Sequence, residues 1–116
     1  MVARGPAGWP RDLPPPGTDE FDAKVAGWLL DRGPADLRSS GIRQWPLALA
    51  HLLVRVLEAE VEGTRKAYAS ARVDLSTHLT PAELASVQAA LEAEGARLLH
   101  MQREVALVAQ ALLSKR

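Results

Sequence analysis

The sequence has no cysteine and few aromatic residues. Without cysteine, the chain can form no disulfide bond, thiolate nucleophile or cysteine-ligated metal site. Aromatic residues make up only 4% of the 116 residues, so any core must consist mainly of Leu, Val and Ala. A core of this kind suits narrow helix-to-helix contacts better than a β-sheet. The composition therefore predicts a small all-α protein.

The chain also lacks an excess of charge of either sign and a long apolar run. Lys and Arg together number 14, as do Asp and Glu, so we expect no general attraction to nucleic acid or to an anionic membrane. The longest apolar stretch, 45–54, contains His51 and has about half of the ~20 residues that span a bilayer. The first 17 residues contain no apolar core of the kind found in signal peptides. These features predict a cytoplasmic protein.

No group of residues in the sequence indicates a particular chemistry. The chain has no glycine-rich phosphate loop, and its three histidines are far apart in the sequence. A C-terminal hairpin would place His100 opposite Glu58 and Glu62, which we interpret as solvated charges and not as a metal site. We therefore predict no catalytic, metal-binding or cofactor-binding residue, no cofactor, and a protein that is not an enzyme.

Two long segments, 45–73 and 80–115, have the periodicity of an antiparallel coiled-coil hairpin. Apolar residues recur in both at alternating spacings of three and four, the pattern of a helix contact line. The first line contains Leu47, Ala50, Val54, Leu57, Val61, Thr64, Tyr68, Ala71 and Leu75, and the second Leu84, Val87, Leu91, Glu94, Leu98, Met101, Val105, Val108 and Leu112. A turn and the capping-box pattern Thr80-Pro-Ala-Glu join the segments. The numbers of facing residues should sum to about 159.

A proline-rich arm and one short helix are predicted ahead of the hairpin. The arm, 1–17, is too rich in proline to be helical, and Trp9 and Leu13 are its bulky apolar residues. Either they pin the arm onto the helical body, or the arm is a ligand for a proline-recognition domain, an interpretation that lacks a spaced second anchor. Thr18 is a good N-cap for a helix over 19–32 that covers the stem of the hairpin. We thus expect an extended arm, 1–17, and a single helical domain, 18–116.

Apolar residues outside the contact lines predict a surface for a protein partner. The first long segment has a second stripe of Trp45, Leu49, Leu52, Val56 and Ala59, and the second segment is widened on one flank by Leu99, Ala106, Ala109 and Leu113. Leaving these residues in water would forgo roughly 25 cal/mol per Å² of apolar surface. We therefore expect a homodimer or a partner helix. The candidate binding residues are Trp9, Leu13, Trp45, Leu49, Leu52, Val56, Leu99 and Leu113.

The middle of the hairpin contains a polar layer, in which Thr64 is expected to face Glu94 with a glycine beside each. One interpretation is a device that fixes the register, with Glu94 paired by Arg65 or Arg97. The other is a small ligand site formed by Thr64, Arg65, Glu94 and Arg97.

Several short runs give the sequence a recognisable pattern. They are Leu13-Pro-Pro-Pro-Gly, Glu20-Phe21, Trp28-Leu29-Leu30-Asp31 and Arg43-Gln-Trp-Pro-Leu. In these runs the chain resembles an uncharacterised family of small actinobacterial proteins with a proline-rich arm ahead of a helical hairpin. The resemblance extends over nearly the whole chain and implies that architecture, with no assigned activity.

From the residues themselves, the favoured function is a non-enzymatic protein–protein interaction module that self-associates as a regulator or adaptor. The alternative is a small-ligand or nucleotide sensor that binds at the polar layer of a dimeric helical bundle.

Overall fold

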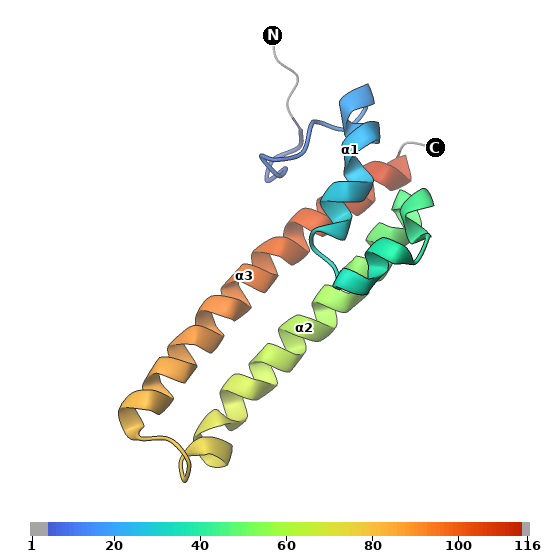
Figure 1. Cartoon of the computed structure of the whole chain (residues 1–116). Helices are drawn as coiled ribbons and strands as arrows, with labels where there is room; N and C mark the ends of the chain where they lie inside the picture. Colours follow the sequence, from blue (N-terminus) through green and yellow to red (C-terminus); the bar gives the residue numbers. More distant parts are fainter. Residues whose placement is uncertain (1–4, 115–116) are drawn as a thin grey trace.

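The chain forms three α-helices and two short 3₁₀-helices in the computed structural model, which describes residues 5–114 (Figure 1). In chain order the elements are α1 (Asp19–Leu30), η1 (Ala35–Ser39), η2 (Ile42–Gln44), α2 (Pro46–Leu75) and α3 (Pro81–Ser114). No strand occurs within residues 5–114, so the all-α prediction is confirmed. The first four residues of the expected arm and residues 115 and 116 lie outside the described range.

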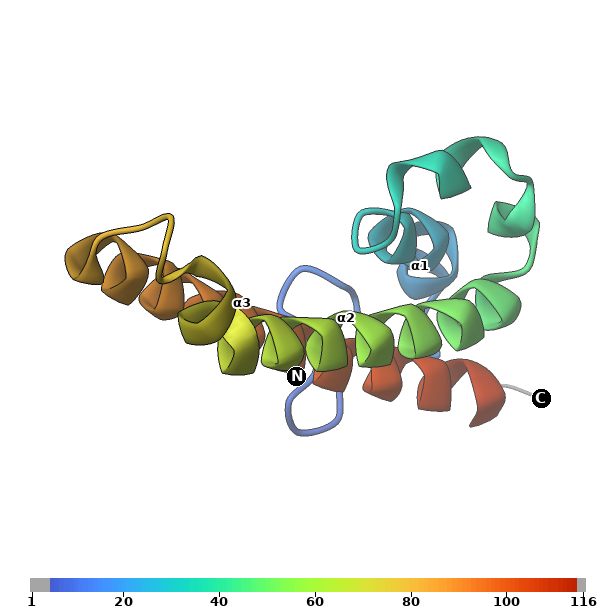
Figure 2. The ribbon, with the colours of Figure 1, turned by 90° about the horizontal axis from the view of Figure 1, so that it is seen from below.

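Helices α2 and α3 form the predicted hairpin and lie side by side in opposite directions (Figures 1 and 2). They contain 30 and 34 residues, or about 45 and 51 Å of helix. The Tyr68 hydroxyl donates to the Glu92 carboxylate across the hairpin at 3.2 Å. A Cβ on Gly95 would lie 3.9 Å from the Thr64 methyl group. The numbers of these facing pairs sum to 159 or 160, in agreement with the expected register.

The helix ends follow the capping signals in the sequence. The Thr18 side chain accepts a hydrogen bond from the Phe21 N–H at 3.1 Å, and Pro46 is the first residue of α2. Thr80 Oγ1 accepts from the Glu83 N–H at 3.1 Å, and the Glu83 carboxylate accepts from the Thr80 N–H at 2.9 Å, which completes the capping box. Helix α1 ends two residues earlier than expected, because the N–H groups of Arg32 and Gly33 bond three residues back and tighten the last turn.

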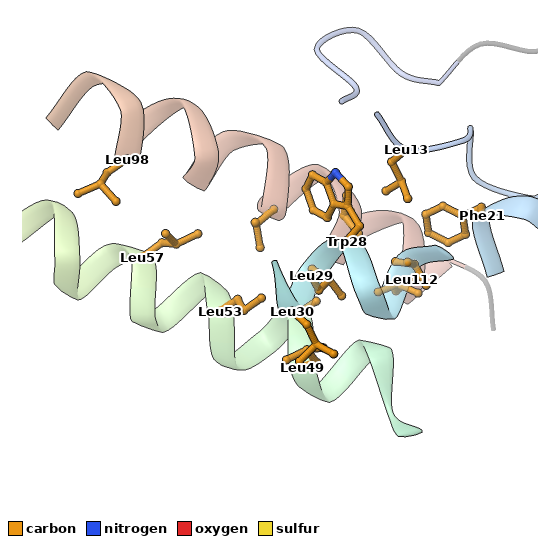
Figure 3. Packing of buried hydrophobic residues seen from close by; sticks show 14 of the residues in the cluster. Leu13, Phe21, Trp28, Leu29, Leu30, Leu49, Leu53, Leu57, Leu98 and Leu112 are labelled. Carbon is orange, nitrogen blue, oxygen red and sulfur yellow. The ribbon is translucent and has the colours of Figure 1, made fainter. Parts of the chain in front are cut away.

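The core lies near the open end of the hairpin, where α1 packs on one face of α2 (Figure 2). Figure 3 shows Leu49 and Leu53 of α2 beside Leu29 and Leu30 of α1, all four with essentially no exposed surface. The largest of the fully buried side chains are Pro10, Phe21, Val25, Leu29, Leu30, Leu49, Leu53, Leu57, Leu98, Val105 and Val108. The short N-terminal helix therefore covers the hairpin at its stem.

Residues 5–17 form a non-helical arm that folds back onto α1 and α3. The Trp9 ring lies 5.8 Å from the Phe21 ring, and Leu13 belongs to the core cluster with 3% of its surface exposed (Figure 3). The arm changes direction at Gly8 and Gly17, whose φ angles are +82° and +85°, values that favour glycine. The two bulky apolar residues thus contact the chain's own body.

The distal half of the hairpin has no third layer (Figure 1). We call residues 62–97 the tip, and the rest of the described chain the stem. Among the described residues of the tip, Ala71 and Leu84 are the buried ones, whereas Val73 is 80% exposed. The tip is therefore a two-helix projection with little core of its own.

Candidate interaction surfaces

An apolar groove lies between α2 and α3 at the open end of the stem, and we call it the stem groove. Its volume is about 690 Å³. Its lining residues are Trp45, Leu47, Ala48, His51, Val54, Arg55, Ala106, Ala109, Gln110 and Leu113. Two of them are large apolar side chains with high exposure: Trp45 is 62% exposed and Leu113 is 48% exposed. The stem groove is therefore an exposed, mainly apolar surface.

The stem groove faces away from α1. At about 100° per residue, Leu47, His51 and Val54 point to a different side of α2 from Leu49 and Leu53, which pack beneath α1. Neither α1 nor the arm contributes a lining residue. Within residues 5–114, this side of the hairpin has no covering element.

The predicted second stripe of α2 is not one surface, contrary to expectation. Leu49 lies in the core, Leu52 and Val56 are half-buried, and Ala59 is exposed. Trp45 instead lines the stem groove. The reason is that Trp45 precedes the helix, with φ −125° and ψ 81°, so its side chain does not follow the helical periodicity from which the stripe was drawn.

The flank predicted on α3 is divided between two grooves. Ala106, Ala109 and Leu113 line the stem groove, whereas Leu99 lines a smaller groove of about 380 Å³ nearer the tip. The groove residues that the sequence interpretation did not single out as candidates are Ala48, His51, Arg55 and Gln110. Ala48, His51 and Arg55 recur at spacings of three and four beside the contact line, so this neighbouring line could have revealed them.

The four residues of the predicted polar layer are divided between a groove and an ion pair. Thr64 and Arg65 line the smaller groove with Tyr68, Leu91, Glu92, Gly95, Ala96 and Leu99. Glu94 and Arg97 are absent from that lining and pair with each other through two hydrogen bonds of 2.7 Å. This bonding lowers the pKa of the Glu94 carboxyl. The Thr64 hydroxyl donates to the Glu60 carbonyl at 2.8 Å, so its polar group is satisfied within α2.

His100 lies beside a carboxylate of its own helix. His100 Nε2 lies 3.5 Å from the Glu104 carboxylate, whereas Glu58 pairs with Arg55 at 3.0 Å. In the part of the chain that the structure describes, no three His, Asp or Glu side chains are grouped to hold a metal ion.

The arm is attached to α1 by a polar contact that we call the arm clasp, made by Asp12, Trp28 and Arg32. The Asp12 carboxylate accepts from Trp28 Nε1 at 2.8 Å and from Arg32 Nη2 at 2.7 Å. The Arg32 guanidinium lies 3.7 Å from the centre of the Trp28 ring, a cation–π geometry. The indole N–H, followed by Arg32, lowers the pKa of the Asp12 carboxyl. Trp9 is satisfied within the arm, where its Nε1 donates to the Leu13 and Pro14 carbonyls.

Comparison of the chain with protein-family models, with curated proteins and with solved structures gives no match. The resemblance to an actinobacterial family therefore stays a prediction. Among the helices described, none has both the length and the hydropathy required to cross a membrane.

Proposed function

We propose that the chain is a non-enzymatic protein-interaction module that self-associates through the stem groove. The observation that supports this most directly is the exposure of Trp45 and Leu113, 62% and 48%, at the edge of an apolar groove that no other described element covers. Covering these side chains removes apolar surface from water at about 25 cal/mol per Å². A partner that fills the groove is therefore favoured over the isolated hairpin.

The stem groove combines projections and hollows on a single surface. Trp45 and Leu113 are large and exposed, whereas Ala48, Ala106 and Ala109 are small. In a twofold dimer both copies present the same patch. The projecting side chains of one copy can therefore fill the hollow of the other, which makes a second copy the partner of best fit.

The charges in the stem groove are compatible with such a dimer. His51 and Arg55 are the ionisable residues among its lining, and Arg55 is already paired with Glu58 on the same helix. When two copies approach each other, the Arg55 guanidinium therefore keeps its carboxylate partner. The contact would be a mainly aliphatic packing of helices, as in a four-helix bundle with coiled-coil contacts.

The face on which the groove opens is long enough for a stable interface. Leu113, Ala106, Leu99 and Glu92 recur every seven residues, so the stem groove and the smaller groove open on the same side of α3. A stable dimer buries about 800 Å² per partner. That is roughly one tenth of the 7754 Å² of accessible surface on this chain. A dimer formed along this face would cover both grooves and the helix surface around them, without involving α1 or the arm.

The test is sedimentation analysis of the purified chain over a range of concentrations. We expect a reversible dimer, and we expect Leu113→Glu to raise the dissociation constant at least about tenfold, because it places a carboxylate in an apolar interface. Val73→Glu is the matched control, since Val73 is 80% exposed on the tip and its substitution should leave dimerisation unchanged. Circular dichroism should show equal helix content in all three proteins. A wild-type chain that stays monomeric at every concentration would contradict the proposal.

A further inference from the structure

The arm occupies a surface formed by two helices that are distant in sequence. Its Trp9 ring packs against Phe21 of α1 at a tilt of 43°, and its residues Pro6 and Gly8 lie near Leu107 of α3. We call the surface beneath the arm the arm site. It is formed by Phe21 and Trp28 of α1, by Arg32 just after α1, and by Leu107 and Ala111 of α3.

The arm site recognises particular side chains as well as apolar surface. It accepts an indole ring against Phe21, a leucine in the core, and a carboxylate between the Trp28 N–H and Arg32. The carboxylate receives two short hydrogen bonds, one of them from a cation, and charge-assisted bonds of this kind are the stronger ones. Each of these contacts is made equally well by an arm from the same chain or from another copy.

The junction between the arm and α1 can turn at a single residue. Gly17 has φ +85°, and a Cβ there would meet nothing within 4 Å. Pro14 and Pro15 precede a turn at Pro16 and Gly17, and Thr18 after it begins the cap of α1. One hydrogen bond spans the junction, from the Thr18 hydroxyl to the Pro15 carbonyl at 2.8 Å. Rotation at Gly17 therefore moves the arm as a unit.

The arm is packed closely on α1 and loosely on α3. A cavity of about 420 Å³ lies between Pro6 and Pro16 of the arm and Leu107 and Ala111 of α3. A second, of about 570 Å³, is lined by arm residues Ala7 and Gly8 and by His100 and Arg103. Both hollows are open to solvent. On this side the arm therefore lies along α3 without a closed core between them.

We propose that the arm site also binds the arm of a second copy of this chain, so that two copies exchange arms. The arm is held in its own shape by hydrogen bonds from Trp9 to Pro6, Leu13 and Pro14, so it can leave and dock as a unit. Leu13 is four residues from Gly17, and four residues span at most about 14 Å, so exchange requires the N-terminal ends of the two α1 helices to lie close together. Reciprocal exchange gives a closed twofold pair with the same contacts as in one chain. This interface is separate from the stem groove.

The absence of cysteine from the natural sequence allows a direct test with the full chain. One copy carries Ala7→Cys and a second copy, made longer by a tag, carries Arg103→Cys, because both positions line the cavity between the arm and α3. The two copies are mixed, incubated and oxidised, and the products are separated on a non-reducing gel. Arm exchange predicts a mixed disulfide between the two sizes of chain. The control pairs Ala7→Cys with Val73→Cys on the exposed tip.

A mixed disulfide well above the level of the tip control supports arm exchange, and a yield equal to that control overturns it. Repeating the experiment with Leu113→Glu in both copies separates this proposal from association through the stem groove. Arm exchange predicts that the disulfide persists in that background. Its loss there would assign the cross-link to the groove and would overturn the exchange.

The arm clasp provides a second measurement. Asp12→Asn removes the charge that pairs with Arg32 and should increase the rate of mixed-disulfide formation about tenfold, since bonds to charged groups are the stronger ones. Asp36→Asn is the matched control, as Asp36 is exposed in η1. An unchanged rate in Asp12→Asn would show that the arm does not leave its own site before the cross-link forms, and would contradict the proposal.

Discussion

The stem and the tip are built from the same two helices, but among the described residues further elements cover the stem and not the tip (Figure 1). In the stem, α1 and the arm complete the burial of residues such as Leu53 and Val105, which have no exposed surface. In the described tip, burial is limited to Ala71 and Leu84. Because burial of apolar surface contributes about 25 cal/mol per Å², most of the packing free energy lies in the stem. Continuous helices can therefore span two regions of unequal stability.

The tip is held mainly by exposed polar interactions. These are the capping box of Thr80 and Glu83, the pair of Glu94 with Arg97, and the bond from Tyr68 to Glu92, which raises the pKa of the tyrosine. A cap is worth about 1 kcal/mol, and exposed ion pairs about 0–1 kcal/mol. We expect the tip to open before the stem unfolds.

The largest effect should come from a charge in the stem. Leu57→Asp places a carboxylate at a position with 1% exposure and should cost about 4 kcal/mol or more, enough to abolish cooperative folding of a small domain. Val73→Asp makes the same chemical change on the exposed tip and should cost less than about 1 kcal/mol. Urea unfolding followed by circular dichroism measures both. Similar losses in the two variants would contradict the difference between stem and tip.

A smaller and more graded effect is expected from cavities. Leu53→Ala in the stem should cost about 3 kcal/mol, and Leu84→Ala in the tip about 2 kcal/mol or less, because the tip can relax around the missing side chain. Hydrogen exchange measured along the chain shows which region opens, as well as by how much each variant is destabilised. Leu84→Ala should increase exchange in 62–97 and leave α1 protected, whereas Leu53→Ala should increase exchange in both regions. Uniform acceleration by Leu84→Ala would show that the tip and stem open together.

Local signals made most of the helical architecture predictable. The periodicity of apolar residues, Pro46 and the capping box placed the two long helices to within two residues at each described end. The direction from which α1 packs could not be obtained in the same way. Leu53 is on neither predicted stripe of α2, yet it is fully buried beside the residues that follow α1. The apolar pattern of the two long helices does not show on which side a third helix packs.

The interaction surfaces were less predictable, for two physical reasons. The arm clasp joins residues 16 and 20 positions apart through side chains with no repeating pattern. In the polar layer, Gly95 lies near Thr64 as expected, and Glu94 pairs with Arg97, one of the two partners that the sequence offered. This pair joins residues three apart on one helix, so the contact line between the helices could not decide between the two partners.

The smallest predicted effect concerns two glycines. Gly63 lies inside α2, and a Cβ there would meet nothing within 4 Å, so Gly63→Ala should stabilise the isolated chain by up to about 1 kcal/mol. At Gly33, in the stem, a Cβ would lie 2.6 Å from Leu53 Cδ2, so Gly33→Ala should destabilise it by about 1–3 kcal/mol. Urea unfolding of dilute, monomeric protein gives both values. Destabilisation of the monomer by Gly63→Ala would mean that the hairpin needs close backbone approach at this level. An effect confined to dimerisation would instead place Gly63 within the contact between copies.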